Sequence, residues 1–271
     1  MLKRNKQKII LVGYKSFIQT NLFNNLKKRF FVKKLKFRQI NKKNIKGFDI
    51  IINCSNSKNF FHKKYEKKFD RNFKIANIIK LTSIKLFLLS SRQVYSQKLF
   101  LTEKSSLNPL NTYSENCIMS EKLCKKLLKN NLLILRLSNV FGFEKGKKKK
   151  PSMVSLIFKG LKKKEIIFDN NYFLYKDFLP IELLCLYVEK LVSLHAYGIF
   201  NIGSGIPFLV KDFIDEIIDT SKTKIRVRLF KKFNDKSYCF DIKKLTKLSG
   251  IRINKKKLNV YFTKLKNNLM K

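Results

Sequence analysis

The feature that most constrains the fold is an alternation of short apolar runs with longer helix-permissive segments through the first half of the chain. Apolar runs typical of buried strands lie at 8–13, 30–37, 49–54, 85–91 and 132–142. Helix-permissive segments lie between them, at 14–28, 65–83 and 114–128. Strands that alternate with helices form a parallel sheet with helices on both faces, because right-handed crossovers place them there. The sequence therefore predicts a doubly wound α/β fold.

The second half of the chain is less regular and predicts a small C-terminal lobe. Its indicated elements are an amphipathic helix at 180–195, a strand at 198–205, a helix at 209–220, a strand at 224–230 and a helical tail from residue 241. A basic, proline-ended run at 146–153 is either a link into this lobe or a solvated charged loop. We expect a core formed by 1–145 and 180–203, and a lobe formed by 146–179 and 204–271.

The charge balance is strongly basic, with 61 Lys and Arg residues against 18 Asp and Glu and a formal net charge of +43. Such a charge attracts polyanions, such as nucleic acid or a phosphorylated ligand. The alternative is a compositional bias, because Lys, Asn, Ile and Phe are abundant throughout and Trp is absent, as a genome poor in G and C would encode. No nucleic-acid-binding motif accompanies the scattered lysines, so nucleic acid is not the expected partner.

Neither a membrane nor a metal ion is expected as a partner. No apolar run reaches the ~18–20 residues that cross a bilayer. The apolar run after the basic N-terminus is too short for a signal peptide, which favours a cytoplasmic protein. The 5 cysteines form no C-x-x-C pair and the chain has only 2 histidines, so a zinc site is not expected.

Chemistry-bearing residues occur where the fourth strand ends and where the following helix begins. Ser91 ends the apolar run at 85–91, and Tyr113 stands at the head of the helix at 114–128. A strand that delivers a hydroxyl and a helix that delivers a phenol could exchange protons with a carbonyl or an alcohol. The alternative for Tyr113 is an aromatic side chain at the edge of the core.

Segments spread over nearly the whole chain resemble, in the right order, the extended short-chain dehydrogenase/reductase (NAD-dependent epimerase/dehydratase) family, in its nucleotide-sugar branch. They read LVGYKSFIQTNL, DIIINCS, FDRNFKIANII, LFLLSSRQVYS, YSENCIMSEKL, LRLSNVFG, KDFLPIE, GIFNIGSG and DIKKLTKLSG. The resemblance implies a Rossmann-type fold whose core binds NAD(P) and whose lobe faces a nucleotide diphosphate-sugar substrate. It also implies a homodimer formed through the helix at 114–128.

The first strand–helix turn carries a reduced form of the family's G-x-x-G-x-x-G motif. A dinucleotide turn uses glycines so that backbone N–H groups at the start of the helix approach the pyrophosphate. Only Gly13 is kept, because Ser16 and Gln19 occupy the other glycine positions. The resemblance implies cofactor contacts from Gly13, Ser16, Phe17 and Ile18. The alternative is a strand–helix turn that binds nothing.

Other positions that the resemblance assigns to the cofactor follow later strands and helices. They are Lys33, Cys54, Ser55, Asn72 and Ser138. About twenty residues after its glycine turn, an NAD site offers Asp or Glu to the ribose hydroxyls. This chain instead offers Lys33, Lys34, Lys36 and Arg38. Cations suit the 2′-phosphate of NADPH better than a free hydroxyl, so NADPH is favoured over NADH.

By resemblance, Tyr113 is the acid/base of the family's Y-x-x-x-K motif, Ser91 is its hydroxyl partner, and Asn139 contacts the substrate. An unperturbed tyrosine has a pKa near ~10, and the motif's lysine favours the phenolate. Cys117 stands at the position of that lysine, while Glu121 keeps the register of the motif. A neutral thiol cannot lower the pKa of Tyr113. Two interpretations therefore stay open: an NAD(P)-dependent epimerase or reductase, and a catalytically impaired relative that binds a nucleotide or a partner protein.

The residues after Ser91 disfavour one reaction of the family. By resemblance, a 4,6-dehydratase would carry Asp-Glu directly after the hydroxyl residue, as acid and base for the elimination of water. This chain has Arg92 and Gln93 there, and neither side chain can serve as that acid or base.

Overall fold

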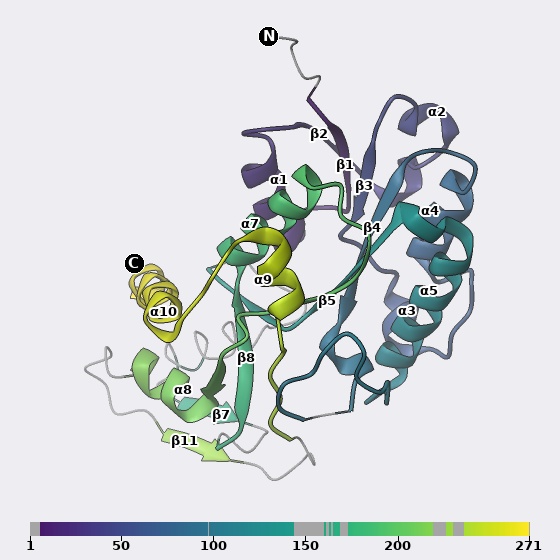
Figure 1. The fold of residues 1–271 in the computed structure, drawn as a ribbon. Coiled ribbons are helices and arrows are strands. Elements are labelled where there is room, and N and C mark those ends of the chain that lie inside the picture. The colour runs from purple at the N-terminus through teal and green to yellow at the C-terminus, as the bar shows by residue number, and fades with distance from the viewer. Residues whose placement is uncertain are drawn as a thin grey trace. The chain divides into compact units, whose positions relative to one another are not determined.

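The computed structural model describes residues 6–96, 98–143, 160, 163, 165–168, 173–218, 226–229 and 236–270. The chain divides into two compact units (Figure 1). The first comprises Met1–Ser96, Glu103–Leu137 and Cys185–Asn201, and the second comprises Gln97–Thr102, Ser138–Leu184 and Ile202–Lys271. The basic run at 146–153, for which two interpretations were open, lies outside the described residues.

A six-stranded sheet forms the centre of the first unit, in the order β2-β1-β3-β4-β5-β9. Its strands are β1 (Lys8–Val12), β2 (Phe31–Leu35), β3 (Ile50–Asn53), β4 (Lys85–Ser91), β5 (Leu132–Leu137) and β9 (Gly198–Ile202). The paired strands from β2 to β5 all run parallel. The aliphatic side chains of β1 from Ile9 to Val12 are fully buried, as expected of a strand covered on both faces.

Helices cover both faces of this sheet, which confirms the predicted doubly wound α/β fold. They are α1 (Phe17–Leu26), α2 (Lys42–Ile45), α3 (Lys58–His62), α4 (Arg71–Ile79), α5 (Thr112–Leu128) and α7 (Ile181–Ser193), with 3₁₀ turns at Phe37–Gln39, Arg92–Val94 and Lys129–Asn131. Helices α3, α4 and α5 lie on one face, and α1 and α7 lie on the other (Figure 1). The very short helices α2 and α3 were not predicted, because so few residues show no helical periodicity.

Capping residues, more than apolar periodicity, decide where the helices of this unit begin. The helix predicted at 65–83 begins only at Arg71, because the Asp70 side chain accepts a hydrogen bond from Phe73 N at 3.0 Å. Helix α5 begins before Ser114, at Thr112, because Asn111 and Ser114 form a reciprocal capping box.

The second unit is built around two small sheets and an aromatic core. Its elements are β6 (Asn139–Phe141), β7 (Glu165–Phe168), β8 (Tyr175–Pro180), β10 (Pro207–Leu209), β11 (Arg226–Leu229), α8 (Val210–Ile218), α9 (Lys243–Ser249) and α10 (Lys255–Met270). The sheets have the orders β10-β8-β6 and β11-β7. Phe178, Phe213 and Phe262 pack together in the core, and the first two rings stack 4.7 Å apart.

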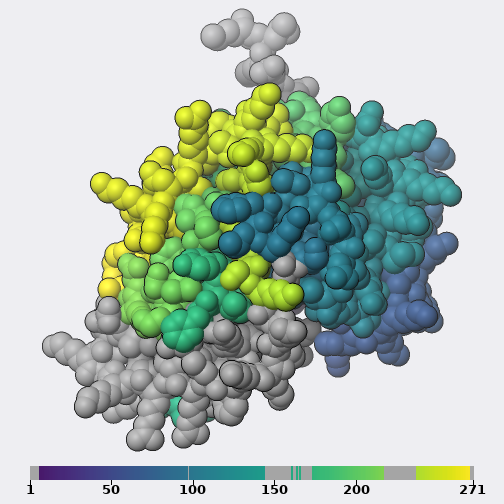
Figure 2. All heavy atoms as spheres, turned by 60° about the horizontal axis from the view of Figure 1, so that its bottom comes forward, coloured from purple at the N-terminus to yellow at the C-terminus, as the bar shows by residue number. Residues whose placement is uncertain are grey.

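Two boundaries in the second unit differ from the sequence prediction. Pro180 ends strand β8, so α7 begins one residue later than predicted, at Ile181. The tail from residue 241 is helical but broken, because Gly250 adopts a left-handed φ of +72° and ends α9. Many side chains of this tail are exposed, and its yellow spheres are visible on the face shown in Figure 2.

None of the helices in the described part of the chain combines the length and the apolar character needed to cross a bilayer. Nor do the described residues bring together three or more His, Cys, Asp or Glu side chains that could hold a metal ion.

Candidate active site

The ends of strands β1, β3 and β4 lie at one edge of the parallel sheet and carry most of the predicted site residues of the first unit. Gly13 follows β1, Cys54 follows β3, and Ser91 ends β4. The first two turns are adjacent, since a Cβ atom added to Gly13 would lie 3.6 Å from the Cys54 carbonyl oxygen. In open α/β folds, ligands bind at this carboxyl edge.

The turn after β1 leads from a buried strand into a capped helix, and Ser16 and Gln19 stand where the motif has glycines. Gly13 has a φ of +153°, which side chains rarely tolerate. Ser16 caps α1, because its hydroxyl accepts a hydrogen bond from Gln19 N at 3.2 Å. The buried Gln19 side chain turns inward and donates to the Leu11 carbonyl at 3.4 Å. Phe17, which begins α1, and Ile18 thus provide the first helical N–H groups at this edge.

A basic cavity of about 400 Å³ adjoins the glycine turn. It is lined by Gly13, Tyr14, Lys36, Phe37, Arg38 and Arg71. The Lys36 ammonium lies 4.7 Å from the centroid of the Tyr14 ring, and the Arg71 guanidinium lies 5.0 Å from that of Phe37. Of the four cations singled out in the sequence, Lys36 and Arg38 line the cavity. Lys33, on β2, pairs with Ile10 of β1 and is not among the lining residues.

The polar residues after β3 tie the strand to two helices. Asn53 donates to the Asn72 side-chain oxygen at 2.6 Å, and Asn72 donates to the Ser120 hydroxyl at 3.4 Å. Ser55 donates to Asn53 through both its hydroxyl, at 2.9 Å, and its backbone N–H, at 3.1 Å. Asn72 is buried and engaged in this network. Burial raises the pKa of the Cys54 thiol to about 12, so this thiol is neutral at pH 7.

Tyr113 lies in the first turn of α5, with its ring against helix α3. The ring stacks on Phe61, with centroids 4.9 Å apart, and meets Phe60 edge-on at 6.2 Å. Burial, together with the Cys117 thiol one turn later, raises the phenol pKa well above its usual value. Ser91 accepts a hydrogen bond from Gln93 N at 3.2 Å and so caps the turn after β4.

A buried polar cluster lies behind the Tyr113 helix, and most of its members were missed in the sequence. Glu121 accepts hydrogen bonds from the Ser90 hydroxyl at 2.5 Å and from three Arg136 N–H contacts at 2.5, 3.1 and 3.2 Å. Arg136 also donates to the Tyr95 hydroxyl at 2.7 Å. One signal was present in the sequence: an arginine within the apolar strand LLILRL needs a buried partner.

The two predicted site residues of the second unit, Ser138 and Asn139, follow strand β5, and Ser138 contacts a buried aspartate. The Ser138 hydroxyl donates to Asp177 Oδ1 at 3.1 Å. Asp177 is fully buried and also accepts backbone N–H groups from Ser204 at 2.8 Å and from Phe240 at 3.2 Å. Burial raises the pKa of Asp177, although these hydrogen bonds oppose the shift. Asn139 begins β6 opposite Phe178. The sequence segment KDFLPIE was noted, but Asp177 was not singled out.

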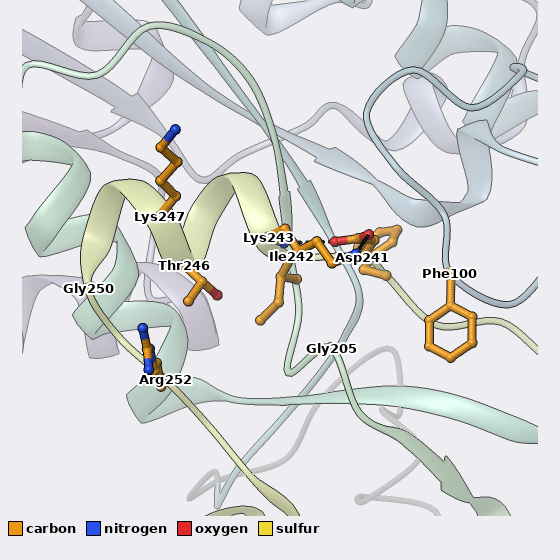
Figure 3. A pocket seen from close by; sticks show the side chains of 10 residues that line it. Phe100, Gly205, Asp241, Ile242, Lys243, Thr246, Lys247, Gly250 and Arg252 are labelled. Carbon is orange, nitrogen blue, oxygen red and sulfur yellow. Dashed lines mark hydrogen bonds and ion pairs between the residues drawn. The ribbon is translucent and has the colours of Figure 1, made fainter.

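A larger cavity, of about 980 Å³, lies in the second unit and contains none of the predicted site residues. Figure 3 shows Phe100 reaching it from one segment and Ile242, Thr246 and Arg252 from the C-terminal segment. Lys243, whose side chain points toward Asp241, pairs with that carboxylate at 3.5 Å.

Comparison with known proteins gives the same assignment as the motifs. The model of the NAD dependent epimerase/dehydratase family matches residues 3–203. No protein of curated function matches the sequence significantly. Among solved structures, UDP-N-acetylglucosamine 4-epimerase from Methanobrevibacter ruminantium M1, in complex with UDP-N-acetylmuramic acid, is 14% identical with a TM-score of 0.85, covering 98% of this chain and 99% of its own.

Two further structures resemble the chain and differ in the cofactor that they hold. UDP-glucuronic acid 4-epimerase from Bacillus cereus, in complex with NAD, is 16% identical with a TM-score of 0.79, covering 97% of this chain and 99% of its own. RMD from Pseudomonas aeruginosa, complexed with NADPH, is 15% identical with a TM-score of 0.80, covering 97% of each chain. The family model matches most of the sequence, and the chain has the parallel α/β fold described above. This chain therefore belongs to the NAD-dependent epimerase/dehydratase family.

Proposed function

We propose that this protein is an NADP(H)-dependent epimerase or reductase of a nucleotide-linked sugar, with Tyr113 as its acid/base and Ser91 as the hydroxyl partner. The observation that carries the proposal is the position of Tyr113. Its phenol stands at the head of α5 with Cys117 one turn behind it, in the register of the family motif. Ser91 ends the neighbouring strand β4.

The residues of the first unit fit a nicotinamide dinucleotide. Gly13 leaves the turn after β1 without a Cβ, and the Gln19 amide, which packs against Gly13, is held by its hydrogen bond to the Leu11 carbonyl. The pyrophosphate would lie at the N-terminus of α1, beside Ser16. Two of the cations that line the basic cavity, Lys36 and Arg38, support a 2′-phosphate and hence NADPH over NADH. When bound, the dinucleotide supplies the hydride acceptor or donor.

The protein's own contribution is to hold and move a proton. The raised pKa of Tyr113 keeps its phenol neutral at pH 7. A neutral phenol can give its proton to an oxygen that becomes an alkoxide during carbonyl reduction. For the opposite direction, a Tyr113 phenolate would have to take the proton of the sugar hydroxyl, and the raised pKa of Tyr113 disfavours that anion. The stacking of its ring on Phe61 holds the phenol in place for either step.

A second candidate function is supported by the replacements at the motif. Cys117 carries no charge to stabilise a phenolate, because burial raises the pKa of its thiol to about 12. A chain with this residue could keep the fold and bind a nucleotide or a partner protein without turnover. This candidate predicts cofactor binding or partner binding with no hydride transfer.

Cofactor titration and turnover together test the two candidates. NADPH and NADH are titrated while nicotinamide fluorescence is followed, and UDP-N-acetylglucosamine and UDP-glucuronic acid are offered as probes in the presence of NADP⁺ or NADPH. The proposal expects NADPH to bind more tightly, and Tyr113→Phe to lower kcat by about 10²–10⁴-fold with little change in NADPH affinity. No binding at millimolar dinucleotide would refute an oxidoreductase, and binding with no turnover would favour the impaired relative.

A further inference from the structure

The cavity of about 980 Å³ in the second unit has an aromatic side and a cationic side. In the view of Figure 3, the Phe100 ring lies on one side, Lys247 and Arg252 lie on the other, and Ile242 lies between them. Every residue that lines the cavity belongs to the second unit. Small-molecule sites in proteins usually have volumes of about 300–1,000 Å³. The cavity is therefore large enough for a small organic ligand.

Phe100 presents its ring to the cavity in an unfavourable backbone conformation. Its φ is +58°, which is uncommon for a bulky residue and costs free energy, and the residue is 58% exposed. The next residue, Leu101, is buried and held from both sides. Its N–H donates to the Cys239 carbonyl at 2.8 Å, and its carbonyl accepts from Asp241 N at 2.9 Å. These two bonds fix the backbone beside Phe100, so its ring stays outside the core and next to the cavity.

The opposite side of the cavity carries a net positive charge. Lys243, Lys247 and Arg252 are its cationic side chains, and Asp241 is the one carboxylate among the lining residues. Asp241 is already engaged, because it accepts from Lys243 N at 2.8 Å and pairs with Lys243 Nζ at 3.5 Å. Among the ion pairs formed by the described residues, none uses Lys247 or Arg252. These two cations are therefore open to an anionic ligand.

The end of helix α9 brings the cationic residues to the same cavity. Thr246 and Lys247 lie in the helix, and Gly250 ends it with a left-handed φ of +72°. Arg252 follows two residues later and lines the cavity from the segment after this turn. In Figure 3 the Thr246 side chain lies between Lys247 and Arg252. Its hydroxyl adds a neutral hydrogen-bond donor to the two cations.

We infer that this cavity binds a nucleoside diphosphate, whose base stacks on Phe100 and whose phosphates contact Lys247 and Arg252. Bases stack on exposed aromatic side chains, and Arg and Lys are the usual partners of phosphate. None of the residues proposed for catalysis or for the nicotinamide dinucleotide lines this cavity. The inference therefore goes beyond the proposed function and does not depend on it.

A ligand with both an aromatic ring and phosphates accounts for both sides of the cavity. Inorganic phosphate would neutralise the cations but leave the Phe100 ring without a contact. An uncharged aromatic compound would cover the ring but leave Lys247 and Arg252 unpaired. Lysines are common throughout this chain, with 61 Lys and Arg residues in all, so positive charge alone does not define a site. The exposed ring held beside the cations is what distinguishes this cavity.

Isothermal titration calorimetry of the full chain with ADP and with pyrophosphate tests both contacts. Phe100→Ala should raise the Kd for ADP about tenfold and leave the Kd for pyrophosphate unchanged, because only ADP has a base. The double variant Lys247→Gln/Arg252→Gln should raise both Kd values about tenfold or more. The substituted side chains are exposed, so these variants should keep the fold.

Two matched controls separate the site from the general surface. Leu99→Ala removes a neighbouring apolar side chain, 40% exposed, that does not line the cavity. Lys256→Gln removes an exposed lysine on α10 that does not line it either. The Kd for ADP should not change in either control. If Lys256→Gln weakens ADP as much as the double variant does, the cations act only through the overall charge and the inference is wrong.

The basic cavity beside Gly13 could also take ADP, and Arg38→Gln identifies that case. If Arg38→Gln raises the Kd for ADP while Phe100→Ala does not, ADP occupies the basic cavity and the inference is wrong. No heat of binding at millimolar ADP would also overturn it. A protein that binds ADP as described but does not bind NADPH would support the inference, although the proposed function would fail.

Discussion

Removal of the Glu121 carboxylate should be among the most damaging single changes in the first unit. The Glu121 and Arg136 side chains are 6% and 3% exposed and lie 2.5 Å apart at Oε2 and Nη2. In Glu121→Leu, the guanidinium would remain buried without its countercharge, and Ser90 would lose its acceptor. Breaking a buried pair in this way costs about 3–5 kcal/mol. For a chain of this size, that corresponds to a fall of roughly 6–20 °C in Tm.

The loss should be recovered when both charges are removed together. Adding Arg136→Met to Glu121→Leu takes away the unpaired cation, and replacing a buried ion pair by apolar side chains is often neutral or stabilising. The free energies of unfolding of wild type, both single variants and the double variant are measured by urea denaturation with circular dichroism. A matched exposed pair, Glu182 and Lys264 at 2.9 Å, provides the control. Glu182→Gln should cost no more than about 1 kcal/mol.

Two outcomes would show that this reasoning is wrong. A cost below about 1 kcal/mol for Glu121→Leu would mean that Arg136 finds water or another acceptor. A double variant less stable than Glu121→Leu would mean that Arg136 stabilises the fold through Tyr95, which it contacts at 2.7 Å, more than through Glu121.

Three further predictions concern other parts of the chain. Arg38→Gln should raise the Kd for NADPH about tenfold in fluorescence titration and leave the Kd for NADH unchanged, because only NADPH carries the 2′-phosphate. Gly205→Ala should lower the free energy of unfolding, measured in urea, more than Gly250→Ala does. Both glycines have φ near +70°, but only at Gly205 would the new Cβ meet Ile242, at 2.6 Å. Equal losses of stability would exclude the clash. Folding raises the pKa of the Cys117 thiol from 9.0 to about 12. The contribution of this raised pKa to the free energy of unfolding is therefore complete below pH 9 and is lost as the pH rises from 9 to 12. The free energy of unfolding should fall by up to about 1.4 kcal/mol per pH unit in that window, and Cys117→Ala should flatten this slope.

The strand–helix alternation and the order of the motifs could be recognised in the sequence because both depend on residues that are close together along the chain. Buried strands need continuous apolar runs such as KIILV in β1, and a helix repeats its face every few residues. The same locality placed Cys117 one helical turn after Tyr113, since residues four apart on a helix are neighbours. The exact helix starts at Arg71 and Thr112 were missed because they depend on single capping side chains.

Which buried polar residues contact one another depends on how the sheet and helices pack. Arg136 on β5 finds Glu121 on α5 only because the sheet register sets it beside Ser90. Likewise, Arg71 joins Lys36 in one basic cavity although the two are far apart in the sequence. The α/β class, the family and the substitution at the motif's lysine position could all be predicted from the amino-acid sequence. The partners of buried charges could not be predicted from the sequence. Burial makes a specific partner necessary, but only the packed sheet and helices determine which residue that partner is.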